Sequence, residues 1–231
     1  MEVMSLLFVL AVLLLFAGIV YSAVISTRRN RQAKEQMAQL LGLTPVQPDA
    51  DLYEKIAALH RTPSNTAKYE LRHVFRRALS DGELFLFDLI DTSSDGDSWT
   101  CTQAVAVRSP YLRLPPFELF PKVDSKNYAL GGLTNIIVAW VAAKSGEPVE
   151  FPQFPEFAAR YVVISTDPEA MRHFFDERMA GYFAQTAYYS LQAAADLFVF
   201  AEIEPGFDTS DQLLMARRLA RAQEIFRLWQ T

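Results

Sequence analysis

The chain has 231 residues, a formal net charge of −5 and a sequence pI near 5.3. This charge balance excludes the basic field with which nucleic-acid-binding proteins displace counterions from phosphate groups. A single cysteine, Cys101, excludes an internal disulfide and fits a reducing compartment.

The first long stretch, Val3 to Thr27, carries no charge and consists mostly of Leu, Val, Ile, Phe and Ala. As a helix it would reach roughly 37 Å, whereas the hydrocarbon core of a bilayer is about 30 Å thick. The stretch therefore predicts one uncleaved transmembrane helix. A cleaved signal peptide is the alternative, but no Lys or Arg precedes the run, and Tyr21 occupies a position where cleavage requires a small residue.

The residues that follow this stretch are basic: Arg28, Arg29, Arg31 and Lys34. By the positive-inside rule, they predict an N-terminus outside the cell and a cytoplasmic C-terminal domain. Within the stretch, the small residues Ala11, Gly18 and Ser22 recur at helical spacing, which predicts a face for docking against a neighbouring membrane helix.

The domain boundaries follow from this anchor: residues 1–27 form the anchor, 28–48 a basic juxtamembrane stalk and 49–231 the cytoplasmic domain. Helical character continues to Leu41, where Gly42 provides a stop. Asp49 is then placed to cap a short amphipathic helix that ends near Arg61.

Three extended segments follow, over residues 68–78, 82–92 and 98–108, and turn-forming residues separate them. They predict three antiparallel strands in sequence. The middle segment alternates Leu84, Leu86, Asp88 and Ile90 on one face with Phe85, Phe87 and Leu89 on the other. Apolar residues on both faces predict a central strand that is buried on both sides.

Two stretches rich in Pro and Phe, residues 109–121 and 148–157, predict edge or irregular segments, because proline cannot donate to a strand ladder. A PxxP ligand at Pro152–Pro155 is the alternative, although the usual flanking basic residue is missing. Between them, residues 129–143 carry no charge and are too short to span a bilayer. They predict a helix that is buried or lies against the membrane face.

The last third of the chain predicts a strand over residues 159–166, a helix capped by Asp167 that runs past Phe183, a strand over residues 197–203 and a final helix from about Ser210. The fold class is therefore α+β, with one N-terminal transmembrane helix and a mainly antiparallel sheet of five or six strands with packed helices. The polar side of the final helix carries Arg217, Arg218, Arg221 and Arg227. These arginines predict a contact with anionic lipids, unless they only complement the helix dipole.

No known catalytic motif was found, and no catalytic residue or cofactor is predicted. The three histidines, His60, His73 and His173, share no motif and are interpreted as structural. The residues closest to a metal site alternate oxygen side chains as in the first half of a calcium loop: Asp91, Ser93, Asp95 and Asp97. Thr102 replaces the expected glutamate, so a solvated hairpin loop is the alternative to calcium.

The sequence thus predicts a single-pass, membrane-anchored, non-catalytic interaction module, an accessory or stabilising subunit of a membrane protein complex. Its predicted partners are the lipid bilayer and other integral membrane proteins, and not nucleic acid. One alternative is a membrane-tethered enzyme that uses the carboxylates of Asp88, Asp91 and Asp95. Another is a lipid-binding or lipid-sensing domain whose Phe-rich segments line a cavity.

Overall fold

The computed structural model describes residues 29, 31–60, 68–92, 99–122, 146–186, 189–202 and 212–230. Its strands are β1 (Thr44–Pro45), β2 (Lys68–Leu79), β3 (Gly82–Thr92), β4 (Trp99–Arg108), β5 (Leu114–Pro121), β6 (Glu147–Pro148), β7 (Tyr161–Ser165), β8 (Tyr189–Ala195) and β9 (Leu197–Glu202). Its helices are a helix of residues 31–40, here called the N-terminal helix, and α2 (Ala50–His60), α4 (Pro155–Arg160), α5 (Pro168–Phe174), α6 (Glu177–Gln185) and α7 (Gln212–Trp229).

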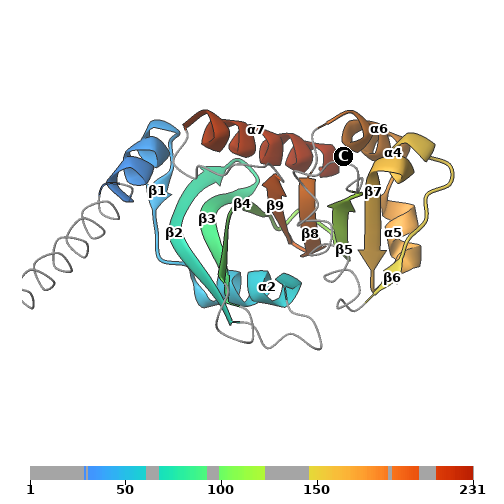
Figure 1. The fold of residues 1–231 in the computed structure, drawn as a ribbon, viewed down its shortest axis with the longest axis horizontal. Coiled ribbons are helices and arrows are strands. Elements are labelled where there is room, and N and C mark those ends of the chain that lie inside the picture. Colours follow the sequence, from blue (N-terminus) through green and yellow to red (C-terminus); the bar gives the residue numbers. More distant parts are fainter. Residues whose placement is uncertain are drawn as a thin grey trace, which may run out of the picture.

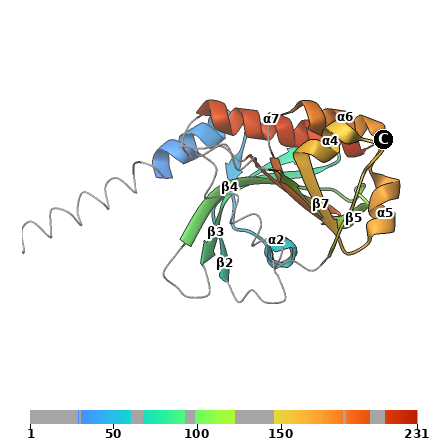
Figure 2. The ribbon, with the colours of Figure 1, turned by 45° about the vertical axis from the view of Figure 1, so that its right-hand side comes forward.

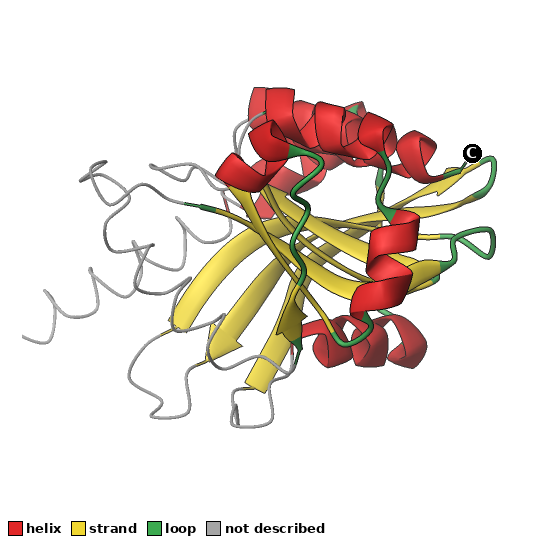
Figure 3. Cartoon of the chain, turned by 90° about the vertical axis from the view of Figure 1, so that its right-hand side faces the viewer, coloured by secondary structure: helices red, strands yellow, loops and turns green. Residues whose placement is uncertain are grey.

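These strands form one nine-stranded sheet in the order β1-β2-β3-β4-β9-β8-β5-β7-β6 (Figure 1). Every neighbouring pair is antiparallel. Helix α7 runs along one face of the sheet, and α4 and α6 lie on the same side, whereas α2 lies against the opposite face (Figure 2). Seen from the side, the sheet is therefore a layer between helices (Figure 3).

The sheet separates two apolar cores, because neighbouring side chains in a strand point to opposite faces. In β3, Leu84 and Leu86 belong to the core beneath α7, whereas Phe85 and Phe87 belong to the core against α2. This division confirms the prediction of a central strand that is buried on both faces. The predicted run of three strands is also confirmed, as β2, β3 and β4.

Three predicted helix ends have the expected geometry. Gly42 has a φ of +72°, the left-handed conformation that glycine adopts readily, and it ends the N-terminal helix. The Asp49 carboxylate accepts a hydrogen bond from the Leu52 backbone N–H at 2.6 Å at the start of α2. Asp167 accepts one from Ala170 N–H at 3.0 Å, and Pro168 occupies the first position of α5.

The first Pro-Phe stretch differs from its prediction, because β5 is an interior strand between β8 and β7. Its register with β8 shifts between Leu114 and Phe117, so Pro115 and Pro116 lie at an irregularity where ladder hydrogen bonds are already interrupted. The second stretch agrees with its prediction only in part: β6 is an edge strand of two residues and irregular chain follows it, but residues 155–157 form the start of α4.

Three further elements differ from the sequence prediction. The predicted strand over residues 159–166 begins only at Tyr161, because α4 precedes it. The single helix predicted after Asp167 is divided into α5 and α6, and Asp176 caps the second through the Met179 N–H at 2.8 Å. The strand predicted over residues 197–203 is the second half of a β8–β9 hairpin, whose turn places Ala195 at a φ of 54°.

The apolar stripe predicted for the final helix is confirmed. Its five members are all buried on the sheet side of α7: Met215, Leu219, Ala222, Phe226 and Trp229.

The structure corrects the membrane part of the predicted fold class. In the described ranges, no helix is long and apolar enough to cross a membrane. The longest of them, α7, has 18 residues and carries four arginines. The structure therefore does not support the predicted single-pass fold, N-terminus-outside topology or membrane localisation. The fold shown is a mainly antiparallel nine-stranded sheet with packed helices.

Several predicted features lie outside the described residues: the segment Val3–Thr27 with Ala11, Gly18 and Ser22, the residue Arg28, the segment 129–143 and the loop with Ser93, Asp95 and Asp97. The predicted stalk is mostly described. Its Lys34, Ala38 and Leu43 are buried, so this part of the chain contributes to the folded domain.

Candidate functional site

A row of polar side chains crosses one end of the sheet beneath the N-terminal helix and α7. Its members come from four adjacent strands and are called the polar row: His73 of β2, Asp88 of β3, Gln103 of β4 and Glu202 of β9. Asp88 is paired with Gln103 across β3 and β4. Val105 of β4 is paired with Phe200 of β9. Gln103 lies two residues before Val105 and Glu202 two residues after Phe200, so both side chains point to the same face of the sheet.

The centre of the row is a buried ion pair. The Lys34 Nζ donates to Asp88 Oδ2 at 2.6 Å, and the two side chains are only 9% and 5% exposed. His73 Nδ1 lies 2.8 Å from the same Asp88 oxygen. Because a carboxylate that is paired with an ammonium group accepts hydrogen bonds, we assign the ring proton of His73 to Nδ1.

His73 occupies a strained backbone position in β2. The register with β3 shifts between Arg72 and Phe75, which marks a β-bulge, and His73 has a φ of 49°. A left-handed residue at a bulge is usually glycine, and a larger residue there costs about 1–3 kcal/mol. The bulge turns the ring toward Asp88 and leaves the side chain 32% exposed.

Two arginines of α7 complete the row at its other end. Arg218 is 1% exposed and its Nη1 donates to Gln103 Oε1 at 2.6 Å. Its Nε lies 3.7 Å from Glu202 Oε2, and Arg217 Nη2 donates to the same Glu202 oxygen at 2.8 Å. Buried charges require such partners, because an isolated charge in a protein interior is strongly unfavourable.

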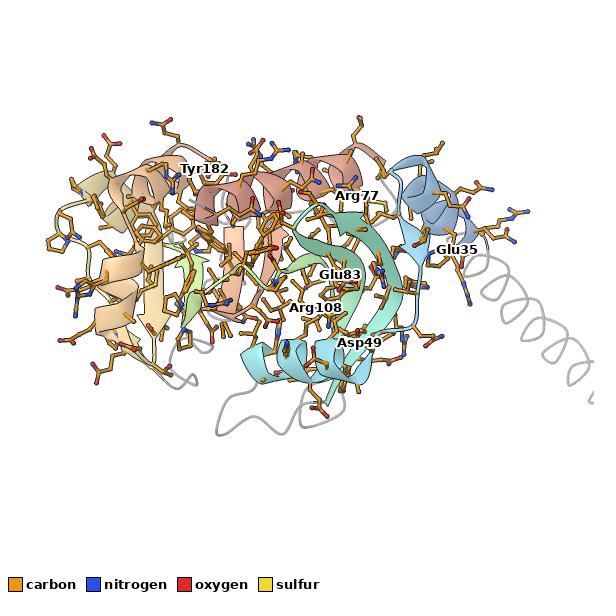
Figure 4. All side chains as sticks on the ribbon, turned by 180° about the vertical axis from the view of Figure 1, so that it is seen from behind. Glu35, Asp49, Arg77, Glu83, Arg108 and Tyr182 are labelled. Atoms are coloured by element: carbon orange, nitrogen blue, oxygen red, sulfur yellow. The ribbon has the colours of Figure 1, made fainter. Side chains whose placement is uncertain are left out.

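A surface groove lies where the row reaches solvent at β2. Residues of the N-terminal helix, the segment 45–48 and β2 line a volume of about 460 Å³. Its lining residues are Arg31, Glu35, Pro45, Val46, Gln47, Pro48, Leu71, Arg72, His73, Val74 and Phe75. Figure 4 shows Glu35 on the N-terminal helix at this end of the molecule. We call this feature the β2 groove.

The β2 groove borders an incompletely paired edge of the sheet. Strand β1 pairs with β2 at Phe75 and Arg76, and the next residue, Val46, donates its backbone N–H to the Val74 carbonyl at 2.9 Å. Within the described chain, no strand pairs with residues 70–72 on that side of β2, whereas the Tyr69 carbonyl accepts a hydrogen bond from the Tyr53 hydroxyl at 2.7 Å. Unpaired edges can add a further strand from another chain.

Cys101 lies beside the row on β4 and is half-buried. Burial raises the pKa of its thiol, and the negative charge of Asp88 raises it further. A raised pKa disfavours the thiolate, which is the reactive form of a cysteine.

A second charged cluster lies at the opposite end of β3 and ties α2 to the sheet. Arg108 is 2.7 Å from Glu83 and 3.1 Å from Asp49. Figure 4 labels these three residues. The hydrogen bond from Arg108, together with that from Leu52 N–H, lowers the pKa of Asp49. Every carboxylate in this cluster that contacts Arg108 is partly exposed, so we interpret it as structural.

The basic residues on which the topology prediction was based have different environments in the structure. Arg29 is exposed, Arg31 pairs with Glu35 at 2.8 Å, and Lys34 is buried on Asp88. The four arginines predicted to contact lipid also differ in environment: Arg218 is buried, whereas Arg227 is exposed. Arg221 pairs with Glu224 at 2.9 Å.

The metal prediction stays a prediction. Three of its four residues lie outside the described part, and so does the side chain of Asp91. Among the residues that the structure describes, no group of three His, Cys, Asp or Glu side chains is arranged to hold a metal ion.

Comparison with protein-family models, with curated proteins and with solved structures found no match to this chain.

The sequence contained one signal for the polar row. Asp88 interrupts the apolar face of a strand that is otherwise buried, and a buried carboxylate requires a partner. The identity of that partner is not readable from sequence, because Lys34 lies 54 positions earlier. The role of His73 was also missed, because a bulge without glycine has no local sequence marker.

Proposed function

We propose that the chain is a non-catalytic protein-interaction module that receives an extended segment of a partner protein in the β2 groove. The observation that carries this proposal is the juxtaposition of the groove with the incompletely paired edge of β2. An extended segment placed there can hydrogen-bond to the strand edge while its side chains enter the groove.

The buried ion pair supports this function by fixing the groove walls. Lys34 joins the N-terminal helix to β3, and His73 joins the β-bulge to the same carboxylate. Because both walls are held by one buried group, the groove keeps its shape without a partner. A site that is already formed binds with a smaller loss of conformational entropy.

The Phe-rich segments have a different role. Phe151, Phe157 and Phe175 are at most 2% exposed and contact one another, with ring centroids 4.6 to 5.7 Å apart. They belong to the apolar core beneath the helices. This arrangement favours a packing role for these rings over the lining of a lipid cavity.

An acid–base enzyme is the second candidate, because a histidine that is oriented by a buried aspartate resembles a general base and its orienting group. It ranks second because the Asp88 oxygen that contacts His73 also accepts a hydrogen bond from Lys34, so the carboxylate is not a dedicated partner of the ring. Faster hydrolysis of a panel of carboxylate and phosphate esters by the wild type than by His73→Asn would favour the enzyme.

The proposal is tested by site-specific photo-cross-linking in cells that express the full chain. A photoreactive residue is placed at Gln47, in the groove, or at Gln185, at the end of α6; both glutamines are exposed. We expect a discrete protein adduct from position 47 and not from position 185. Equal adducts at the two positions, or none at position 47, would contradict the proposal.

A further inference from the structure

We propose that the ring of His73 replaces a backbone carbonyl in the β2 groove and accepts, at Nε2, a hydrogen bond from a backbone N–H of the bound segment. This inference rests on the proposed function and adds the chemistry of the contact. It describes a partner that is recognised by its extended main chain and not by a charged side chain. One residue of that partner cannot be proline, which has no backbone N–H.

The charges of the β2 groove do not select a charged partner. Arg31 pairs with Glu35 at 2.8 Å, and Arg72 pairs with Glu70 at 2.7 Å. Each guanidinium therefore has a carboxylate beside it, and the two pairs together carry no net charge. Recognition in the groove consequently depends on hydrogen bonds and apolar contacts.

The backbone edge that is open to a partner is short. The Tyr69 carbonyl accepts a hydrogen bond from the Tyr53 hydroxyl at 2.7 Å, and the Val74 carbonyl accepts one from the Val46 N–H at 2.9 Å. Between these two occupied carbonyls lie residues 70–73 of β2. The open edge therefore ends at the β-bulge.

The β-bulge gives His73 this role. At a φ of 49° its backbone leaves the extended conformation, and the regular pattern of strand hydrogen bonds is interrupted there. Nδ1 carries the ring proton and lies 2.8 Å from Asp88, which leaves Nε2 as an acceptor. The ring lines the groove, and none of the described residues donates to Nε2. Nε2 is therefore the acceptor that the groove offers where the regular ladder stops.

Binding of such a segment depends on pH, because a backbone N–H can only donate. When the ring gains its second proton, Nε2 becomes an N–H group and two donors face each other. Binding should therefore be strongest at pH 8 and fall as the pH is lowered to 5, the range in which histidines ordinarily change charge.

The other charged or titratable groups around the ring come from the N-terminal helix, β2, β3 and β4: Arg31, Lys34, Glu35, Glu70, Arg72, Asp88 and Cys101. Carboxyl groups ordinarily titrate at lower pH than imidazole, and ammonium, guanidinium and thiol groups at higher pH. A loss of binding between pH 8 and pH 5 is therefore assigned to the ring of His73.

The test combines a displayed peptide library with amide-to-ester substitution. Peptides are selected on the full chain at pH 8, and those that cross-link to a photoreactive residue at position 47 and not at position 185 are kept. Each amide of a kept peptide is then replaced in turn by an ester, which removes one N–H. At one position, the ester should weaken binding to the wild type about three- to tenfold, measured by fluorescence anisotropy.

His73→Asn is the informative variant, because its side-chain amide can still donate to Asp88 and asparagine tolerates a positive φ. It has no acceptor at the position of Nε2. It should therefore bind the unmodified peptide about three- to tenfold more weakly than the wild type. At the critical position the ester should cause no further loss in this variant, and its affinity should not change between pH 8 and pH 5.

His173→Asn is the matched control. His173 is exposed on α5, which lies at the opposite end of the molecule from β2 (Figure 1). This variant should respond to the ester and to pH as the wild type does.

Equal ester effects in the wild type and His73→Asn, or wild-type binding that does not fall at pH 5, would overturn the inference and leave the proposed function standing. If no selected peptide cross-links at position 47, both the inference and the proposed function fail.

Discussion

The face of the sheet beneath α7 is built differently at its two ends. Near β5 and β7, Phe157, Phe175 and Phe183 pack with ring centroids 4.6 to 6.5 Å apart, and each is at most 2% exposed. Near β2, β3 and β4, the same layer contains the polar row, with the buried pair of Lys34 and Asp88 at its centre.

This difference indicates that the two ends serve different purposes: the aromatic end stabilises the fold, and the polar end shapes the β2 groove. Aromatic packing gains free energy from buried area and ring contacts. A buried ion pair gains little net stability, because removing both charges from water offsets their attraction. The polar row is therefore better explained by the shape that it imposes on the β2 groove than by its contribution to the free energy of unfolding.

The largest effect is expected at the aromatic end. Phe157→Ala removes a ring that contacts Phe151, Tyr161, Phe175 and Phe183, and should lower the free energy of unfolding by about 3–5 kcal/mol. Urea denaturation measures it. A loss below about 1 kcal/mol would show that the rings at this end do not form a packed core.

The second prediction compares one change with two at the polar end. Asp88→Asn leaves Lys34 buried without a counter-charge and should lower the free energy of unfolding by about 3 kcal/mol. The double variant Lys34→Met/Asp88→Leu removes both charges and should recover most of this loss. Equal destabilisation of the two variants would show that the ion pair itself stabilises the fold.

A smaller effect isolates the strain at His73. His73→Ala and His73→Gly both remove the ring and its contact with Asp88, but only alanine keeps a Cβ at a φ of 49°. The glycine variant should therefore be more stable than the alanine variant by about 1 kcal/mol. Thermal unfolding at matched pH measures the difference, and equal stabilities would remove the argument for strain.

The smallest effect belongs to the exposed cluster at Asp49. Asp49→Asn keeps a capping side chain for α2 but removes the negative charge beside Arg108, so its destabilisation should stay within about 1 kcal/mol. The pKa of Asp49 is lowered in the fold, so its charge stabilises the protein above the ordinary value of about 4. That contribution is lost as the pH falls through the lowered pKa.

The free energies of unfolding of the wild type and Asp49→Asn should therefore become equal as the pH is lowered from 7 to 2. A difference that stays constant over this range would contradict the assigned ion pair.

Local patterns predicted the parts of the fold that local chemistry determines. Alternation identified β2, β3 and β4, and capping residues identified the starts of α2 and α5. Non-local packing decided the rest. Pro115 and Pro116 predict an edge, but a register shift accommodates them inside the sheet.

The candidate site was mostly hidden from the sequence for the same reason. Lys34 belongs to a basic cluster that predicted membrane topology, and only tertiary packing shows that it pairs with Asp88. Asp88 was visible as a polar residue on an apolar face, whereas the bulge that places His73 depends on the register between two strands. Sequence alone therefore indicated one member of the site and not its geometry.

The most direct test of the central claim is the affinity of Lys34→Met/Asp88→Leu for a peptide selected on the wild-type chain. If the polar row serves the groove, this variant should melt close to the wild type but bind the peptide about tenfold more weakly or worse, a difference of about 1.4 kcal/mol. Wild-type affinity in the folded double variant would contradict the claim that the buried ion pair shapes the β2 groove.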